Sequence, residues 1–321
     1  MRAIDLFCGA GGSSWGARLA GAQMVGAFDA WDLAGQVYKD NFPDAHFFHG
    51  RLEEMDLPAI TKQLGEVDLM LASPECTNHG PAKGNRPRCE NSKNTAFQVT
   101  RFARALKPRW IVIENVSSMR RWDRYEELID NLIDLGYHIH PQILNSAQFG
   151  VPQRRRRLFL LCDLKKQPDP VKLPTSSGKT AADIVDLNGA YSYSPLRTDR
   201  RAKATIERAE RAIKELGDGA PFLLVYYGSD HAGGWQSLNV PLRTVTTLDR
   251  FAIVKPHRGR HIMRMLQIPE LKAAMGMPAQ MRFEAGSRRD RIKMIGNAVC
   301  PPVMRYVVKH LISEGAIHAS K

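Results

Sequence analysis

The fold is decided by RAIDLFCGAGG, residues 2–12, at the start of the chain. RAID predicts a strand, the glycines at positions 9, 11 and 12 predict a tight turn, and a helix is expected from about Ser13 to Ala20. Glycine lets the main chain approach a ligand closely and adopt positive φ. The dinucleotide pattern G-x-G-x-x-G is absent, and no Lys-Ser/Thr pair follows to form a phosphate loop. The stretch therefore predicts an α/β fold with a different ligand loop.

The alternation of strands and helices continues to about residue 164. It predicts a doubly wound, mostly parallel α/β sheet closed by a final pair of strands. Ligands of such sheets gather at the carboxyl ends of the strands, where the glycine turn, Asp29, Cys76 and Glu114 all fall. Further strands are expected at 23–29, 67–73, 109–115, 137–144 and 156–164, and further helices at 31–42, 95–107 and 125–136.

The composition changes after residue 164. Residues 165–180 are rich in Pro, Ser and Lys, 200–219 form one charged amphipathic helix, and 221–230 and 240–254 are typical of strands. We therefore expect three parts, at residues 1–164, 165–255 and 256–321. The last part contains DRIKMIGNAVCPPVMRYVVKHLISEG, which is expected to open with a Gly-Asn turn and to end in a helix.

The bulk composition restricts the class of protein. The 321 residues carry a net charge of +13, which favours a polyanion such as nucleic acid as partner, although a generally basic soluble enzyme is the plainer alternative. The longest apolar runs have strand length, so no membrane span or membrane partner is expected. Five cysteines at irregular spacing and no secretory signal indicate reduced thiols and a cytoplasmic protein, associated with the nucleoid if prokaryotic.

Cys76 lies in LASPECTNHG, residues 71–80, directly after an apolar strand. A thiol is useful as a nucleophile when it is ionised and reachable. A zinc site of Cys76, His79 and Cys89 is the alternative, but the spacing C-x2-H-x9-C matches no common zinc pattern. The signature of the zinc deaminases is also missing, so no metal is expected.

Acidic and basic residues follow two other strands. Glu114 ends the apolar strand RWIVIEN, where a carboxylate is costly unless it is paired or used. Four arginines, residues 154–157, lead into the last strand. With a period of two, Arg155 and Arg157 share one face and the other two share the opposite face. A solvated edge strand or a nonspecific phosphate patch is the alternative interpretation of this run.

Together these motifs resemble the cytosine-C5 DNA methyltransferases in order and in approximate spacing. The resemblance extends from the first strand to about Val303 and is weakest across 165–239. It implies an S-adenosylmethionine-dependent methyltransferase sheet in 1–164, a smaller target-recognition domain in 165–255, and a C-terminal segment, 256–321, that returns to the first domain. It rests on DLFCGAGG at 5–12, the Pro-x-Cys turn at 74–76, ENV at 114–116, QRRRR at 153–157 and GNAVCPP at 296–302.

The resemblance implies S-adenosylmethionine as cofactor and double-stranded DNA as partner, with a monomeric enzyme that flips a cytosine out of the duplex. Cys76 corresponds to the nucleophile that attacks C6, and Glu114 to the acid that engages N3 and the amine. Arg155 and Arg157 complete the catalytic set, and Pro74, Asn115 and Gln153 are expected to contact the substrate. The implied cofactor contacts are Phe7, Gly9, Ala10, Gly12, Asp29, Ala30, Trp31, Leu52, Asn297, Ala298 and Val299.

The chain departs from the family pattern at three positions. Glu75 replaces the proline before the nucleophile, and Thr77 replaces a glutamine. The carboxylate of Glu75 is expected to raise the pKa of the neighbouring thiol. Arg51 stands where an acid would bind the adenine amine, so that contact is not expected here.

Two other functions fit the same residues. An RNA cytosine-C5 methyltransferase of the tRNA-methylating branch would carry a Cys-Phe-Thr motif in its target region, but no cysteine occurs between Cys162 and Cys300. A catalytically silent, DNA-binding member is permitted by the altered turn at Cys76, although the retention of Cys76, Glu114, Arg155 and Arg157 together argues against it. The target sequence cannot be read from the chain, because base contacts come from a few loop side chains.

Overall fold

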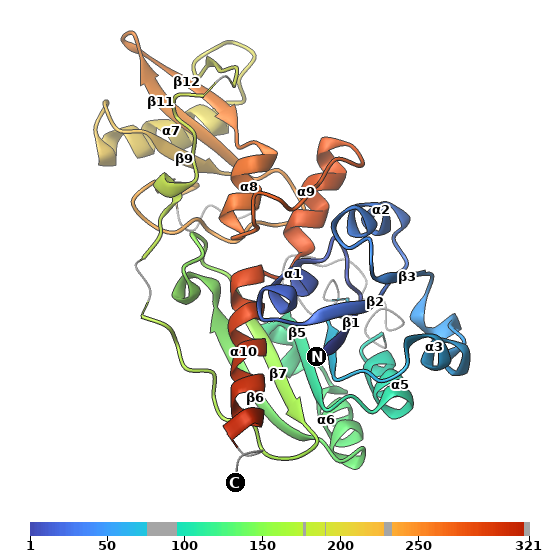
Figure 1. The fold of residues 1–321 in the computed structure, drawn as a ribbon. Coiled ribbons are helices and arrows are strands. Elements are labelled where there is room, and N and C mark those ends of the chain that lie inside the picture. The colour runs from blue at the N-terminus through green and yellow to red at the C-terminus, as the bar shows by residue number, and fades with distance from the viewer. Residues whose placement is uncertain (76–94, 176–177, 190, 228–232, 318–321) are drawn as a thin grey trace.

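The computed structural model describes residues 1–75, 95–175, 178–189, 191–227 and 233–317, with the backbone alone for 314–317. Within these ranges the chain forms a seven-stranded sheet and a five-stranded sheet. The two sheets lie one beyond the other, with α8 (Ile268–Ala274) and α9 (Arg288–Asn297) between them (Figure 1). No helix in the described ranges is both long and apolar enough to cross a membrane.

The larger sheet has the order β3-β2-β1-β4-β5-β7-β6. All neighbouring pairs are parallel except those of β7, which runs antiparallel to both β5 and β6. The predicted doubly wound, mostly parallel sheet with a closing pair is thus confirmed. The strands are β1 (Arg2–Leu6), β2 (Gln23–Asp29), β3 (His46–His49), β4 (Leu69–Ala72), β5 (Trp110–Val116), β6 (His138–Asn145) and β7 (Arg156–Asp163).

Helices cover both faces of this sheet, which explains why its strands read as continuous apolar runs. Ala3 packs into the core with α1, α2 and α10, and the next residue, Ile4, into the core with α3, α5 and α6. A Cβ on Gly16 would lie 2.5 Å from Met304 Cβ, so α1 and α10 touch closely. The helices are α1 (Gly12–Leu19), α2 (Asp32–Asn41), α3 (Leu57–Leu64), α5 (Phe97–Leu106), α6 (Tyr125–Asp134) and α10 (Pro301–Ile317).

The direction of β7 positions the arginine run. Because β7 is antiparallel to β5, the first residues of β7 lie beside the last residues of β5, and Arg157 pairs with Val116. The arginines therefore reach the carboxyl edge of the parallel strands, where Glu114 and Asn115 also lie.

The second sheet is antiparallel, with the order β10-β9-β11-β12-β8. The amphipathic helix α7 (Lys203–Leu216) packs Ala209 and Ala212 against it. The expected boundary after residue 255 falls inside β11, and we propose that this unit extends to about residue 265. The strands are β8 (Ser194–Pro195), β9 (Phe222–Val225), β10 (Trp235–Ser237), β11 (Phe251–His257) and β12 (Arg260–Met265).

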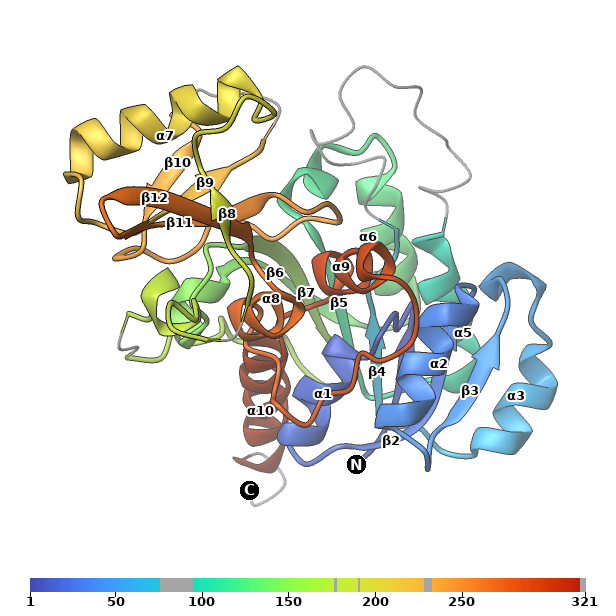
Figure 2. The same ribbon diagram turned by 90° about the horizontal axis from the view of Figure 1, so that it is seen from above.

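Two predicted local structures are wrong. Residues 240–250, expected as the first part of a strand, contain no strand, because their main chain instead contacts the segment before β7: Arg154 N donates to Leu242 O at 2.7 Å. The Gly296-Asn297 pair does not open a turn. It ends α9, a helix begun by a capping box between Ser287 and Asp290. The last helix, α10, then returns to the larger sheet beside α1 (Figure 2).

A buried ion pair joins the second sheet to α8. Arg264 Nη2 lies 2.7 Å from Glu270 Oε1, and both side chains are 3% exposed. Glu270 also accepts hydrogen bonds from the main-chain N–H of Asp186 and of Gln267. Three segments of the chain therefore meet at one carboxylate.

We expect Glu270→Ala to lower the free energy of unfolding by about 3–5 kcal/mol, because it leaves the buried Arg264 without its counter-charge. Glu210, in an exposed pair with Arg197 at 2.7 Å, is the matched control, and Glu210→Ala is expected to cost about 1 kcal/mol or less. Urea unfolding measures both, and equal losses in the two variants would contradict the structural role given to the buried pair.

Candidate active site

A cavity of about 600 Å³ opens at the carboxyl edge of the larger sheet. Its walls come from the loops after β1, β2 and β4, the ends of β5 and β7, and α9. The structure brings together fifteen of the residues predicted from sequence on this cavity: Phe7, Gly9, Ala10, Gly12, Asp29, Ala30, Trp31, Leu52, Pro74, Glu114, Arg155, Arg157, Asn297, Ala298 and Val299.

Three predicted site residues do not line the cavity in the described structure. Cys76, the predicted nucleophile, lies outside the described residues, and the last described residue before it, Glu75, does line the cavity. Asn115 is buried behind the wall, and its Nδ2 donates to Pro74 O at 3.1 Å. Through this hydrogen bond, Asn115 holds the turn that leads to Cys76. Gln153 is fully buried.

Gln153 connects distant segments instead of facing the cavity. Its Nε2 donates to Ala274 O at 3.0 Å, and its Oε1 accepts from Val245 N at 3.0 Å. Met275 Sδ is a further neighbour of Nε2. This geometry favours a structural role over the substrate contact that the resemblance implies.

The turn after β1 is shaped for close contact. Phe7, Gly9 and Gly11 have φ values of 58°, 51° and 88°, in the left-handed region that favours glycine. A Cβ on Gly12 would lie 2.4 Å from Val299 O, so only glycine allows the C-terminal segment to close against this turn. A Cβ on Gly9 would meet nothing within 4 Å, which leaves this part of the turn open to a ligand.

Asp29 is held rigidly at the end of β2. Its Oδ2 accepts from Gly9 N at 2.8 Å, and its Oδ1 accepts from Trp31 N at 2.8 Å. Burial raises the pKa of this carboxyl, and the main-chain donors oppose that shift. Each oxygen keeps a further lone pair, so the side chain can accept hydroxyl groups from a ligand in the cavity.

Lys293 was not singled out from the sequence. It extends from α9 and places its Nζ 4.1 Å from the centre of the Trp31 ring, within the range of a cation–π contact. Both residues line the cavity. The contact links the C-terminal segment to the loop after β2, and nothing in the local sequence of either residue indicates it.

Glu114 and Arg157 form an ion pair at the inner end of the cavity. Arg157 Nε lies 3.2 Å from Glu114 Oε1, and the two side chains are 17% and 8% exposed. Burial raises the pKa of Glu114, while the charges of Arg157 and Arg155 act in the opposite direction. Arg154 and Arg156 are exposed, so the two pairs of arginines face opposite sides, as the alternation predicts.

Arg155 is buried and bonds to main-chain carbonyls. Its Nη1 donates to Val245 O at 2.9 Å, and its Nη2 donates to Gly296 O at 2.8 Å and to Ala298 O at 3.2 Å. The guanidinium thus fixes two segments that come from far along the chain, the one around Val245 and the end of α9. One of them carries Asn297, Ala298 and Val299 to the cavity.

A polar network lies beneath the glycine turn. Ser14 Oγ donates to Asp5 Oδ2 at 2.6 Å and lies 3.0 Å from the hydroxyl of Tyr38. Burial raises the pKa of Asp5 to about 7, partly offset by the hydrogen bonds of Ser14. This network was not predicted from the sequence, where the polar Asp5 inside an otherwise apolar strand is the feature that indicates it.

The described residues contain no group of three or more His, Cys, Asp or Glu side chains that could hold a metal ion. The alternative zinc set of Cys76, His79 and Cys89 lies outside the described residues.

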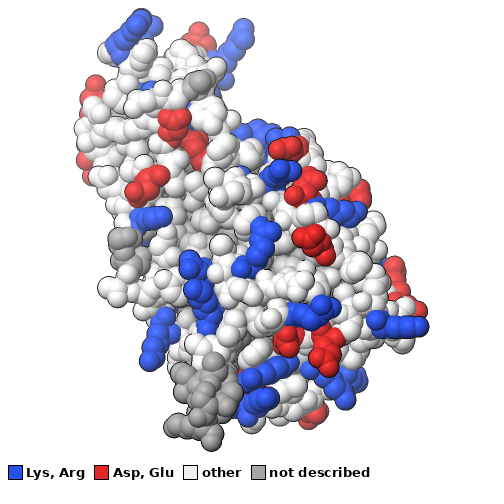
Figure 3. Space-filling model, viewed as in Figure 1, with Lys and Arg blue, Asp and Glu red and all other residues white. Residues whose placement is uncertain are grey.

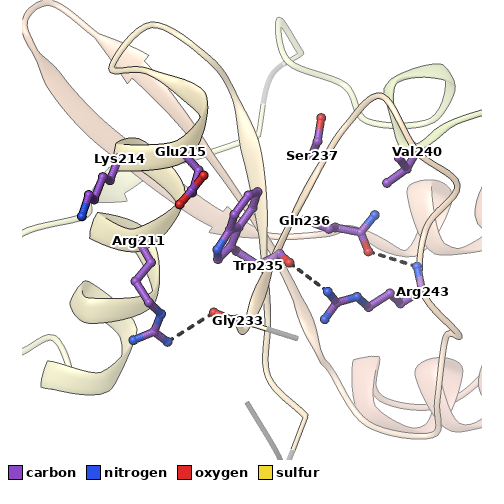
Figure 4. Close-up of a pocket in the computed structure, with 9 residues that line it drawn as sticks. All are labelled: Arg211, Lys214, Glu215, Gly233, Trp235, Gln236, Ser237, Val240 and Arg243. Atoms are coloured by element: carbon purple, nitrogen blue, oxygen red, sulfur yellow. Dashed lines mark hydrogen bonds between the residues drawn. The ribbon is translucent and has the colours of Figure 1, made fainter. Parts of the chain in front are cut away.

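A second cavity, of about 610 Å³, lies between α7 and β10 and contains none of the predicted site residues (Figure 4). Arg211 Nη2 donates to Gly233 O at 3.2 Å, and Arg243 Nη2 donates to Trp235 O at 3.1 Å. These arginines bind the main chain around β10. The predicted site residues that line a cavity in the described structure all line the first one.

Comparison with known proteins gives a consistent result. The sequence model for C-5 cytosine-specific DNA methylase matches residues 1–313. The Type II methyltransferase M.HindV of Haemophilus influenzae is 26% identical, over 98% of this chain and 97% of its own length. The Type II methyltransferase M.HgiDI of Herpetosiphon aurantiacus is 31% identical, over 93% of this chain and 90% of its own length. A prophage-encoded putative DNA modification methyltransferase from E. coli has the same fold, with a TM-score of 0.69 at 20% identity over 98% and 99% of the two chains.

We expect Arg155→Met to lower the free energy of unfolding by at least about 3 kcal/mol, because the buried carbonyls of Val245, Gly296 and Ala298 lose their donor. Amide hydrogen exchange should increase at residues 244–247 and 296–299 in particular. Arg154→Ala, which removes an exposed neighbour, is the control and is expected to change stability by about 0.5 kcal/mol or less. Unchanged exchange in these two loops would refute the role of Arg155 in holding them.

Proposed function

The chain belongs to the C-5 cytosine-specific DNA methylase family, and on that premise we propose that it methylates C5 of a cytosine flipped out of a specific duplex DNA site, through a covalent adduct with Cys76. The methyl donor of the family is S-adenosylmethionine. The observation that carries the proposal is the presence of the Asp29 loop and of the Glu114–Arg157 ion pair on one cavity, whose wall also includes the residue before Cys76.

The cavity fits the donor. Its volume of about 600 Å³ lies within the usual range for ligand pockets. The open side of Gly9 allows a close approach, and Asp29 has free lone pairs for the two ribose hydroxyls. Trp31, which lines the cavity beside Asp29, would offer an aromatic side chain to the purine. Bound there, S-adenosylmethionine supplies an electrophilic methyl group on a positively charged sulfur.

Cys76 and Glu114 activate the base together, each at a different atom. C5 of cytosine is a poor nucleophile, so the Cys76 thiolate first adds to C6. Glu114 hydrogen-bonds N3 and the exocyclic amine, and its raised pKa favours holding the proton that N3 needs. C5 then becomes nucleophilic and takes the methyl group. Loss of the C5 proton and elimination of the Cys76 thiolate restore the aromatic ring.

Arg157 and Asn115 position these groups. Arg157 holds the Glu114 carboxyl at 3.2 Å, which fixes the orientation of the side chain that engages the base. Asn115 binds Pro74 O and so fixes the start of the turn that carries Cys76. None of this chemistry is reachable inside a stacked duplex, so the base has to leave the helix.

We infer that the unit built on the second sheet reads the DNA sequence. The net charge of +13 provides the general attraction to phosphates. On the face shown in Figure 3, basic side chains are interspersed with acidic ones over both parts of the molecule.

Cys76 is tested with duplex DNA that contains 5-fluorocytosine. Fluorine at C5 cannot leave as a proton, so the reaction stalls after methyl transfer and the protein remains linked to DNA. The wild-type chain is expected to give a shifted band on a denaturing gel, Cys76→Ala no band, and Cys89→Ala, a thiol of the same segment, a normal band. An adduct formed by Cys76→Ala would refute the assignment, and methylation of tRNA instead of DNA would indicate the RNA branch.

The two faces of the arginine run are expected to act differently. Arg157→Ala should lower the single-turnover rate at saturating DNA by about a hundredfold, because Glu114 loses the group that orients it. Arg156→Ala should leave that rate nearly intact and reduce the salt dependence of DNA binding by at most about one unit. Equal losses by both variants in both assays would mean that the run is a plain phosphate patch.

A further inference from the structure

An ion pair of Arg51 with Glu53 lies on the wall of the active-site cavity, where Arg51 Nη2 is 2.6 Å from Glu53 Oε1. We propose that Glu53 is a specificity-determining residue, which accepts a hydrogen bond from the exocyclic amine of the donor's purine while Arg51 holds it in place. Arg51 has only donors and cannot accept from an amine. The inference deepens the proposed function and rests on it.

Main-chain contacts place this pair beside the loop that carries Asp29. Strand β3 runs parallel to β2, with His49 paired to Asp29, and Gly50 N donates to Asp29 O at 3.1 Å. The next three residues, 51–53, all line the cavity. The side chains that follow Gly50 are therefore neighbours of the carboxylate proposed to bind the ribose hydroxyls.

The order of the strands determines which way the donor lies from that ribose. Asp29 ends β2, residues 51–53 follow β3, and Glu114 lies in β5, on the far side of β1 and β4. The methyl group has to reach the cytosine that Glu114 engages, so the sulfonium end extends from the ribose toward β5. The purine is joined to the opposite side of the ribose and consequently lies toward β3, at Arg51 and Glu53.

The short turn that carries Glu53 is held from α5. This turn is the 3₁₀ helix η1 (Leu52–Glu54). Arg101 Nη1 donates to Leu52 O at 2.6 Å, and Arg101 Nη2 donates to Met55 O at 2.6 Å. The two bonds fix the main chain on both sides of Glu53. A side chain on a fixed turn can discriminate between ligands that differ by one group.

The carboxylate of Glu53 is oriented and ionised. Arg51 Nε and Nη2 both donate to Oε1, at 2.8 Å and 2.6 Å. Burial acts to raise the pKa of Glu53, but bonds from its own main-chain N–H and from Arg51, with the charge of Arg101, lower it below its ordinary value. A carboxylate has about four lone-pair sites, so Glu53 keeps acceptor capacity for a ligand and cannot act as a donor.

These properties match adenine and oppose a 6-oxopurine. Adenine carries a donor amine at C6, whereas guanine and hypoxanthine carry an acceptor oxygen there. A carboxylate attracts the first and repels the second. Ala30, Trp31 and Leu52 line the same end of the cavity but offer no side-chain acceptor. Lys293, which lies over Trp31, is a donor and does not select for an amine.

The test compares three ligands that differ only at C6 of the purine, by calorimetry on the full chain. S-adenosylhomocysteine carries an amine there, the second ligand carries hydrogen, and the third carries oxygen. The wild-type chain should bind the amine ligand about three- to tenfold more tightly than the hydrogen ligand, as expected for one hydrogen bond at a partly exposed site. It should bind the oxygen ligand most weakly, because two acceptors then face each other.

Glu53→Met removes the acceptor but keeps a side chain of similar length. The preference for amine over hydrogen should disappear, and the oxygen ligand should bind more tightly than it does to the wild type. A loosened turn would weaken all three ligands and would not improve any of them. In methylation assays the variant should raise KM for the donor about three- to tenfold and leave the rate at saturating donor unchanged, since Glu53 does not touch the reacting atoms.

Glu54→Met is the matched control. Glu54 belongs to the same turn and lies 3.9 Å from Arg51 Nε, but it is 71% exposed and is not part of the cavity wall in the described structure. This variant should keep the wild-type order of the three ligands. Equal losses for all three in Glu53→Met, or wild-type values for all, would overturn the inference and leave the proposed function intact. A wild-type chain that binds none of them would refute the cofactor site itself.

Discussion

The arrangement of the site depends on one buried cation. Arg155, at the entrance of β7, donates to the carbonyls of Val245, Gly296 and Ala298. These carbonyls belong to the second unit and to the C-terminal end of α9, about 90 and 140 residues further along the chain. A guanidinium has five donors in a rigid fork, so it can satisfy several carbonyls that no helix or sheet would satisfy. It thereby helps to hold the segment of Asn297 to Val299 against the glycine turn.

The reversed direction of β7 makes this contact possible. In a fully parallel sheet the start of β7 would lie at the edge opposite the site. Because β7 runs antiparallel to β5, Arg155 and Arg157 reach the edge where Glu114 ends its strand. Arg154 and Arg156, which alternate with them, are exposed. The strand direction brings the run to this edge, and the alternation of side chains along it separates the arginines of the cavity from those that face solvent.

Local patterns predicted most of the larger sheet but little of what joins its parts. The run QMVGAFD predicted β2 with its correct bounds, because seven consecutive residues are suited to a strand buried on both faces. The short strand β3 and the helix α3 were not predicted, since HFFH and LPAITKQL are too short to show a clear period. Residues 240–250 read as a strand, but their partners are the segment before β7 and Tyr227, whose hydroxyl bonds to Thr244 O.

The sequence by itself determined the alternating α/β order, the glycine turn and the residue types that the chemistry needs. These features depend on neighbours within a few positions, where steric and hydrophobic periods act. Only the tertiary structure decided that Gln153 is buried between α8 and Val245, that Lys293 covers Trp31, and that Glu75 and Asp29 share one cavity. Each of these contacts joins residues more than 40 positions apart. Their energies arise from burial and charge that exist only after the sheet, α9 and the second unit have packed together.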